Sequence, residues 1–493
     1  MSTDSVKRYI NHADRFFIGG QWVKPTGLSH IDVRDSATEE VFVSVAEAQV
    51  EDVDRAVAAA RKAFDQGPWP RLSHKERAGW LKKIADAWLE RSAAFADTWT
   101  SESGVLHSVA RMAVVGPAMT FRFYAGLADT FAWEEPHVSQ DGKRAMITRE
   151  PVGVVGAIIP WNAPSALMGY KVAAALIAGC TVIVKGSPEA PTSPYLLAEI
   201  CEEIGLPEGV FNFVTADREV SERLVRHPGI DKISFTGSTA AGRRIASICG
   251  ERIARCTLEL GGKSPAIILD DYDLDTAAES ITQNARFLTG QVCSSLTRLI
   301  VSRKRHDDFV DALSSRFARV RVGNPFDDAS EMGPLAMERQ RDRVESYIAK
   351  GRAEGARLAT GGGRPAHLER GYFIEPTVFG NVDNHSTIAR EEIFGPVLSV
   401  IAAESEDQAI DIANDTIYGL NSSVFTNDPE RAYAVARQIR AGTVGHNSFK
   451  TDFSISFGGF KQSGLGREGG TEGMHSFLEA KTIILDQRWP KAT

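Results

Sequence analysis

Residues 152–186, VGVVGAIIPWNAPSALMGYKVAAALIAGCTVIVKG, contain two short apolar runs on either side of an apolar stretch of helical length. The runs at residues 152–159 and 181–184 are rich in valine and isoleucine, which favour strands. The stretch between them, residues 167–178, has the length of a buried helix. A strand, a helix and a second strand in this order predict one unit of a parallel sheet with a crossover helix.

The same alternation continues along the chain. Further strand candidates lie at residues 211–214, 230–235, 256–260, 266–269, 298–301, 397–401 and 422–425. These runs are apolar along their whole length, as expected for parallel strands that helices cover on both faces. Two glycines interrupt the pattern at residues 260–263 and mark a domain boundary. The sequence therefore predicts an α/β protein with two alternating regions.

The two ends of the chain differ from these regions. Residues 48–130 are mainly helical, because apolar residues recur at helical spacing, as within residues 53–64. Residues 481–485 are an isolated β-prone run. This run could add to the edge of a partner's sheet, which would make it an oligomer contact, or it could form an edge strand within its own chain.

Composition narrows the classes of function. The chain has 493 residues, and its 56 Lys and Arg against 64 Asp and Glu give a net charge of −8. This mild acidity argues against a nucleic-acid or anionic-membrane partner. The most apolar stretch contains Lys171 and is interrupted by Gly179, so no membrane span is expected. The five cysteines include no CxxC pair, and the histidines lack ligand spacing, so we expect a reducing cytoplasm and no metal site.

Two segments have features of an anion or nucleotide site. Residues 235–242, FTGSTAAG, follow a predicted strand and open a predicted helix, whose free N–H groups favour phosphate. They are not the GxGxxG fingerprint, and an ordinary capped helix start is the alternative. Lys185 ends another strand, where it could bond ribose hydroxyls or a phosphate; the alternative is a surface lysine on a turn.

Three residues have features of catalytic groups, each with a structural alternative. Cys293, in TGQVCSS, is a nucleophile or a small buried hydrophobe. Glu259, in LELGGKSP, is a carboxylate inside an apolar run, and it is either a general base or the partner of a lysine such as Lys263. Asn162, in IPWNAP, offers an amide donor to an oxyanion, worth about 3 kcal/mol, or forms an Asx turn or a helix cap before Pro164.

Taken together, the motifs resemble those of the aldehyde dehydrogenase superfamily, in its hydrolytic, non-acylating type. The order PWN, FTGST, ELGGKSP, GQxC, EEIFGPV and FGGFKxSGLGRE is highly specific, and the resemblance runs from FIGGQW at residues 17–22 to the final strand. Glu259 lies 34 residues before Cys293, as in hydrolytic members.

The resemblance implies a three-part architecture: a Rossmann-like parallel-sheet coenzyme domain, an α/β catalytic domain and a small β oligomerisation arm. The coenzyme domain would comprise residues 1–132 and 152–261, the catalytic domain residues 262–477, and the arm residues 133–151 and 478–493. It also implies a homodimer or a homotetramer.

The implied activity is NAD-dependent oxidation of an aldehyde to the carboxylic acid. Cys293 would attack the aldehyde carbon, and the Asn162 side chain and the Cys293 backbone N–H would hold the oxyanion of the thiohemiacetal. Oxidation would leave a thioester on Cys293, which water activated by Glu259 would hydrolyse. Glu468 resembles a glutamate proposed for proton relay.

Coenzyme contacts follow from the same resemblance. They would come from Ile159, Trp161, Lys185, Ser187, Gly237, Ser238, Leu260, Glu392 and Phe394. Many relatives have Lys-Pro-Ser-Glu after the second strand, with a glutamate that binds the ribose and repels a 2′-phosphate. Here Pro188 occupies that position and Glu189 is shifted by one residue. NAD is expected, and NADP is the alternative.

The implied substrate pocket is apolar. Its residues would be Leu167, Tyr170, Phe287, Val292, Phe449 and Phe457. Ala163 and Gly445 replace large residues of many relatives, and Leu288 replaces an asparagine. We therefore expect a roomy tunnel for medium-chain, aromatic or terpenoid aldehydes, although His446 could instead hydrogen-bond a polar substrate.

Two other functions compete with this interpretation. An acylating dehydrogenase would pass the thioester to coenzyme A, but such relatives typically lack the base at Glu259. A non-catalytic structural or binding relative would not need Cys293, Glu259 and Asn162 together.

Overall fold

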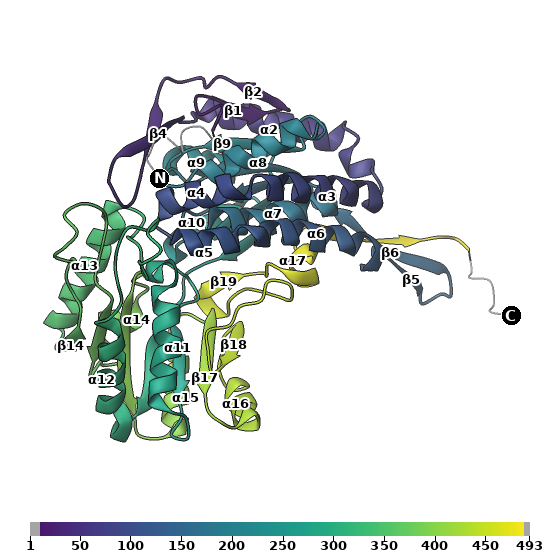
Figure 1. Ribbon diagram of the computed structural model, residues 1–493. Helices are drawn as coiled ribbons and strands as arrows, with labels where there is room; N and C mark the ends of the chain where they lie inside the picture. Colours follow the sequence, from purple (N-terminus) through teal and green to yellow (C-terminus); the bar gives the residue numbers. More distant parts are fainter. Residues whose placement is uncertain (1–9, 488–493) are drawn as a thin grey trace.

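The computed structural model describes residues 10–487 and shows two lobes with a projecting arm (Figure 1). Parallel sheets covered by helices confirm the predicted α/β class. The outer ends of two predicted domains, residues 1–9 and 488–493, lie outside the described residues. No helix in the described part is both long and apolar enough to cross a membrane.

The first lobe is built on an eight-stranded sheet with the order β19-β11-β10-β7-β8-β9-β1-β2. Its strands are β19 (Gly464–Leu465), β11 (Arg255–Glu259), β10 (Lys232–Thr236), β7 (Val154–Ile158), β8 (Thr181–Gly186), β9 (Phe211–Thr215), β1 (Phe16–Ile18) and β2 (Gln21–Val23). The five strands from β11 to β9 are parallel, so their carboxyl ends meet at one edge of the sheet. Ligands of open α/β sheets bind at such an edge.

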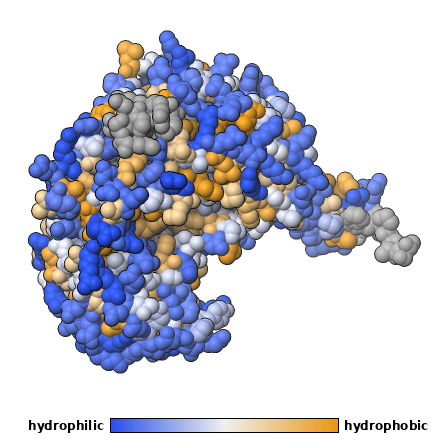
Figure 2. All heavy atoms as spheres, in the orientation of Figure 1, coloured by the Kyte–Doolittle hydropathy of each residue, from blue (hydrophilic) through white to orange (hydrophobic). Residues whose placement is uncertain are grey.

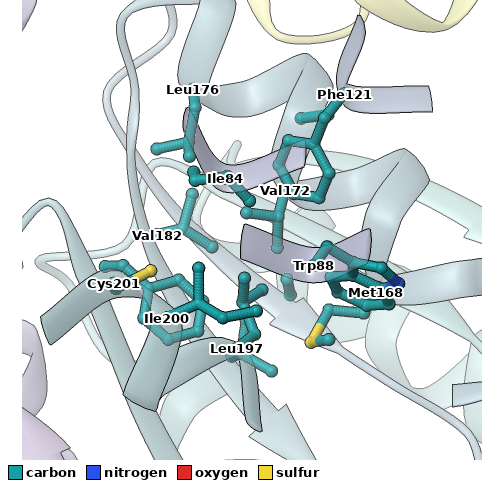
Figure 3. Close-up of a cluster of buried hydrophobic side chains, with 14 of the residues drawn as sticks. Ile84, Trp88, Phe121, Met168, Val172, Leu176, Val182, Leu197, Ile200 and Cys201 are labelled. Carbon is teal, nitrogen blue, oxygen red and sulfur yellow. The ribbon is translucent and has the colours of Figure 1, made fainter. Parts of the chain in front are cut away.

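The core of the first lobe surrounds α7 (Pro164–Ala178), the crossover helix predicted between β7 and β8. Side chains of α7 meet those of α3 (His74–Glu90), α6 (Val115–Thr130), α8 (Thr192–Glu203) and β8 (Figure 3). Because a helix that is apolar on every side must be buried on every side, α7 lies inside the lobe. Lys171 is the charged exception on this helix, and its side chain is fully buried.

The second lobe is built on a seven-stranded sheet with the order β14-β15-β16-β13-β12-β17-β18. Its strands are β14 (Arg357–Thr360), β15 (Thr377–Gly380), β16 (Val397–Ala403), β13 (Leu296–Ser302), β12 (Ser264–Ile268), β17 (Asn421–Phe425) and β18 (Thr443–His446). All neighbouring pairs except β14 and β15 are parallel. β11 of the first sheet leads directly into β12 of the second sheet. The carboxyl end of β11 is therefore joined by a short connection to the amino end of β12.

The arm is a three-stranded antiparallel sheet of β5 (Glu134–Val138), β6 (Arg144–Pro151) and β20 (Leu478–Ile484). The isolated β-prone run near the C-terminus forms most of β20, which pairs with β6 of its own chain. The predicted alternative of an edge strand within one chain is therefore confirmed. Figure 1 shows the arm extending away from both lobes.

The remaining elements surround these sheets. They are β3 (His30–Arg34), β4 (Val41–Ala46), α2 (Val50–Asp65), α4 (Ser92–Ser103), α5 (His107–Ala113), α9 (Arg218–Arg226), α10 (Thr239–Glu251), α11 (Leu274–Arg286), α12 (His306–Phe317), α13 (Glu338–Ala353), α14 (Thr387–Arg390), α15 (Glu406–Asn414), α16 (Pro429–Ala436) and α17 (Gly470–His475). The 3₁₀ turns are η1 (Trp69–Arg71), η2 (Phe287–Gly290), η3 (Arg303–Arg305) and η4 (Lys461–Ser463).

Candidate active site

A cavity of about 720 Å³ lies where the carboxyl ends of the first sheet face the second lobe. Residues that follow β7, β10 and β11 line one side, and the loops before β13 and β16, with the first turn of α13, line the other. The cavity brings together nine of the predicted site residues: Trp161, Asn162, Leu167, Gly237, Ser238, Leu260, Cys293, Glu392 and Phe394.

Cys293 lies in the loop between η2 and β13. The preceding Leu288 and Thr289 have φ values of 49° and 54°, which turn the chain sharply before the cysteine. Burial, together with the nearby carboxylates of Glu392 and Glu259, raises the pKa of the Cys293 thiol to about 12. The cysteine is therefore a partly exposed thiol at the cavity wall, with two carboxyl groups within electrostatic range.

The amide of Asn162 is held beside the cysteine loop. Its Nδ2 donates to the carbonyl of Gln291 at 3.0 Å, and its own backbone carbonyl accepts from Trp99 Nε1 at 2.9 Å. The helix-cap alternative is not what the structure shows, because the N-cap of α7 is Ala163, with no side-chain cap bond. The amide is thus held at the cavity wall close to the segment that carries Cys293.

Glu259, the last residue of β11, is 2% exposed. Within residues 10–487, neither carboxyl oxygen has a hydrogen-bond partner, and the predicted alternative pairing with Lys263 is absent. Burial raises the pKa of Glu259 well above its usual value, and the nearby Glu468 carboxylate adds to the shift. The backbone of Gly458 lies against the Glu259 carboxyl group. A side chain at this position would collide with it, since a Cβ there would lie 2.6 Å from Glu259 Oε1.

Glu468 links Glu259 to the buried lysine of α7. It forms an ion pair with Lys171 and accepts from Ser234 Oγ at 3.3 Å, and all three side chains are buried. Lys171 and Ser234 were not among the predicted site residues. A lysine inside the most apolar run of the chain was the available signal, because a buried cation requires a partner.

The part of the cavity wall formed by residues 236–239 has features that suit a dinucleotide. The hydroxyls of Thr236 and Thr239, beside Gly237 and Ser238, are buried without a hydrogen-bond partner in the described part of the chain. Ser238 also caps α10, because its hydroxyl accepts from the Ala241 N–H at 3.3 Å. Orphaned donors at a helix start are the groups that a phosphate would satisfy.

Glu392 occupies the second-lobe side of this cavity. It accepts from the Gly262 N–H at 3.1 Å, and burial raises its pKa to about 7. Gly261 leaves no room for a side chain, because a Cβ there would lie 2.4 Å from Glu392 Oε2. Trp161 and Phe394 meet edge to face at 5.4 Å, one from each lobe.

Residues 22–483 match the family model described as the aldehyde dehydrogenase family. The chain belongs to the aldehyde dehydrogenase family. It is therefore an oxidoreductase that acts on aldehydes.

Similar proteins support this assignment. The chain is 45% identical over 477 residues to geranial dehydrogenase of Castellaniella defragrans. The aligned region covers 97% of this chain and 99% of the relative. It superimposes on the aldehyde dehydrogenase of Mycobacterium tuberculosis complexed with NAD+ with a TM-score of 0.94, at 44% identity over 97% of this chain and 99% of that one. Aldehyde dehydrogenase C of Pseudomonas syringae, a mutant complexed with NAD+ and octanal, gives a TM-score of 0.92 at 41% identity, covering 96% and 97%.

Three predicted coenzyme residues of this aldehyde dehydrogenase lie outside the cavity wall. Ile159 is 2% exposed and belongs to the hydrophobic core of the first lobe. Lys185 is buried at the end of β8, where its Nζ donates to the Ala216 carbonyl at 3.4 Å and burial lowers its pKa to about 8. It is therefore not the exposed turn lysine of the alternative interpretation. Ser187 donates to Glu189.

Three aromatic rings, which are not among the residues that line the Cys293 cavity, form a stack on α7. Tyr170 of α7 stacks on Phe453 at 4.2 Å, and Phe453 stacks on Phe457, also at 4.2 Å. The sequence analysis missed Phe453, although an aromatic residue four positions before Phe457 was a visible signal. Val292 packs against the core of the first lobe.

Of the six predicted pocket residues, Leu167 lines the Cys293 cavity, and Tyr170, Phe287, Val292, Phe449 and Phe457 do not. Phe287 lines a separate cavity of about 340 Å³ together with Arg286, which forms an ion pair with Glu331 at 3.1 Å. The sharp turn at residues 288–289 separates Phe287 from the cysteine wall. Phe449 packs against the core of the second lobe. His446 Nε2 lies 3.0 Å from the Thr426 carbonyl, so this contact already occupies one nitrogen of the ring.

Apolar side chains also gather on the surface over α5 and α6 (Figure 2). Met112 on α5 is 73% exposed, and Val115 and Met119 on α6 are 39% and 41% exposed. Among the described residues, no group of three or more His, Cys, Asp or Glu side chains could hold a metal ion.

Proposed function

We propose that this enzyme oxidises a hydrophobic medium-chain, aromatic or terpenoid aldehyde to the carboxylic acid, with NAD as coenzyme. The observation that carries the proposal is one cavity wall that contains Cys293 and Asn162, with two buried carboxyl groups within electrostatic range of the thiol. The same cavity is lined by Thr236 and Thr239, whose hydroxyls have no hydrogen-bond partner in the described residues, by four arginines and by Leu167.

Cys293 is the nucleophile in this proposal. Its raised pKa means that the resting group is a thiol, so the attack on the aldehyde carbon requires loss of the thiol proton. The Asn162 amide and the Cys293 backbone N–H donate to the oxyanion that forms. One such donor is worth about 3 kcal/mol of transition-state stabilisation.

Glu259 is the general base for hydrolysis of the thioester. A carboxylate that no hydrogen bond stabilises is a strong base, because burial favours its protonated form. It takes a proton from water, whose oxygen attacks the thioester carbon; the carbon–sulfur bond then breaks, which releases the acid and returns Cys293 as the thiolate. The Glu468–Lys171 ion pair lies within electrostatic range of Glu259. In this proposal its charges assist the departure of the proton that Glu259 takes up.

The residues present fit a nicotinamide dinucleotide. Thr236, Thr239 and Ser238 would hold its diphosphate, and Glu392 and Lys185 would bond its two riboses. When bound, the nicotinamide ring supplies the hydride acceptor that the oxidation needs. The solved relatives with NAD+ favour NAD for this chain.

The substrate class rests on apolar lining and on similar proteins. Leu167 and the rings of Tyr170, Phe453 and Phe457 offer contacts to a hydrocarbon chain. The small side chains of Ala163 and Gly445 leave room. The relatives named for geranial and complexed with octanal act on or hold aldehydes of this kind.

The predicted domain limits and assembly remain part of this proposal. We assign residues 1–132 and 152–261 to the coenzyme domain, residues 262–477 to the catalytic domain, and residues 133–151 and 478–493 to the arm. The open edges of β5 and β20 suit a homodimer or homotetramer. Five free cysteines favour the cytoplasm.

The test is NADH formation with aldehydes of graded length and polarity. We expect octanal, benzaldehyde and geranial to give a higher kcat/KM than acetaldehyde or a charged semialdehyde. The product should be the free acid whether or not coenzyme A is added. Activity confined to acetaldehyde would refute the substrate class, and acyl-CoA as the main product would favour the acylating alternative.

A further inference from the structure

Cys249 and Cys256 form a pair of neighbouring thiols in the first lobe. Cys249 lies near the C-terminal end of α10, and Cys256 is the second residue of β11. A hydrogen bond joins the two side chains, in which the Cys249 thiol donates to the Cys256 sulfur. Neither residue lines the Cys293 cavity, so the pair has no part in the site described above.

The turn between the two cysteines is held at both ends. The Ala254 N–H donates to the Cys249 carbonyl at 2.9 Å. The Arg255 N–H donates to the Asp231 carbonyl at 3.0 Å, and the Arg252 guanidinium donates to a backbone carbonyl of α9 at 2.9 Å. Because these bonds fix the backbone of the turn, the end of α10 and the start of β11 keep the two thiols side by side.

Cys256 is the cysteine of this chain that is best prepared for oxidation. It is half-buried, and the hydrogen bond from Cys249 and the charge of Lys232 lower its pKa to about 7. Lys232 is held beside this strand, because its Nζ donates to Thr257 Oγ1 at 2.6 Å. A large share of Cys256 is therefore thiolate at neutral pH, which is the form that reacts with peroxides. The pKa values of the other four cysteines, all of which lie within residues 10–487, are raised.

We infer that Cys256 and Cys249 form a redox-active dithiol, which a hydroperoxide oxidises to a disulfide and a thiol reductant restores. In the first step the Cys256 thiolate attacks the oxygen of the hydroperoxide that carries the hydrogen. A sulfur–oxygen bond forms, the oxygen–oxygen bond breaks, and the leaving oxygen takes a proton from water. The products are a sulfenic acid on Cys256 and an alcohol, or water if the oxidant is hydrogen peroxide.

Cys249 completes the reaction in the second step. Its thiol loses the proton and its sulfur attacks the Cys256 sulfur, so that the sulfur–sulfur bond forms and the sulfur–oxygen bond breaks. The hydroxide that leaves combines with the released proton to give water, and two electrons have then passed from the two sulfur atoms to the peroxide. The bond to Cys256 is the main cause of the raised pKa of Cys249, so oxidation of Cys256 also frees the Cys249 thiol to react.

The test is peptide mapping of the full-length protein, reduced and desalted, after treatment with hydrogen peroxide at neutral pH. Trypsin cleaves after Arg and Lys, so the two cysteines fall in separate peptides, residues 245–252 and 256–263. After free thiols are blocked with N-ethylmaleimide, we expect these two peptides to be linked by a disulfide that dithiothreitol removes. The oxidised chains should migrate as monomers on a denaturing gel. Cys293 should be oxidised at least about tenfold more slowly than Cys256.

Variants of the two cysteines separate the two steps. Cys249→Ser should stop the reaction after the first step, so that dimedone labels a sulfenic acid on Cys256 at least about fivefold more than in the wild type. In Cys256→Ser neither the label on this pair nor the disulfide should form. Cys201→Ala, which removes a buried thiol of α8, is the matched control and should give the same yield of disulfide as the wild type.

The inference would be overturned if Cys293 were oxidised before Cys256, or if the linked peptides came only from chains joined to one another. Equal dimedone labelling of Cys256 in the wild type and in Cys249→Ser would also overturn it, because Cys249 would then not close the disulfide. These measurements need neither aldehyde nor coenzyme, so their outcome is independent of the proposed function.

Discussion

The two halves of the cavity around Cys293 are built differently. The coenzyme half consists of strand-end and helix-start residues, such as Gly237, Ser238 and Glu392, with hydrogen bonds to neighbouring backbone. The half that we propose for the aldehyde has Leu167 of α7 at the cavity wall, and Tyr170 of the same helix stacks on Phe453 from the loop before η4.

Because of this difference, coenzyme binding and the reaction of the aldehyde should depend on different sets of residues. Backbone hydrogen bonds in the sheet hold the coenzyme half, so a change on the aldehyde side should leave coenzyme binding intact. Cys293 lies at the wall of this cavity, within electrostatic range of the carboxyl groups of Glu392 and Glu259. Variants can therefore test whether the halves act independently.

Replacement of the nucleophile should give the largest effect. Cys293→Ala should lower kcat by more than about 10⁴-fold, because no other thiol takes its place at the cavity wall. The dissociation constant of NADH should change less than threefold, since Cys293 is not part of the coenzyme half. Cys256→Ala, which removes a half-buried cysteine away from the cavity, is the matched control and should keep wild-type activity. Residual turnover near the wild-type level in Cys293→Ala would disprove the assignment.

Replacement of the base should stop the cycle after the oxidation. Glu259→Gln should lower steady-state kcat by about 10³-fold, because water activation is lost while the thiol remains. A rapid-quench experiment should still show a burst of NADH of one per site. Absence of both burst and turnover would instead place Glu259 in the first step.

The pH dependence of thiol reactivity tests how carboxylates on both sides act on Cys293. The pKa of Cys293 is raised to about 12, so its thiolate fraction should rise about tenfold per pH unit from pH 7 to 9. The thiolate fraction of Cys256 should stop rising within the same pH range, because a hydrogen bond from Cys249 and the charge of Lys232 lower its pKa to about 7. Alkylation by iodoacetamide, followed peptide by peptide by mass spectrometry, measures both rates. A plateau for Cys293 below pH 8 would contradict the effect of burial and the two carboxylates.

Loss of the stacked ring should give the smallest effect and only on the aldehyde side. Phe453→Ala should lower kcat/KM for octanal about tenfold relative to acetaldehyde, because apolar contact area between the ring and the octanal chain, worth about 1.5 kcal/mol, is lost. NADH binding should not change. Tyr433→Ala, at an exposed aromatic residue on α16, is the control. An equal loss for octanal and acetaldehyde would show that Phe453 supports the fold and not the substrate.

Much of the site could be predicted from local sequence. Asn162 and Gly237 follow predicted strands and Glu259 lies near the end of a third, and parallel strands bring their carboxyl ends to one edge. Phe287 and Phe449 could not be placed in this way. Their positions depend on a turn with positive φ and on packing against the second lobe, which apolar character alone does not determine.

The amino-acid sequence by itself determined the α/β class, the strand-end motifs and the chemical groups available, because each depends on neighbours along the chain. Only the tertiary structure decided which groups lack partners and which face one another. The orphaned carboxyl of Glu259 and the Glu468–Lys171 pair join residues far apart in sequence. Burial and charge interact through space, so the pKa of Cys293 follows from the packing of two lobes and not from its own motif.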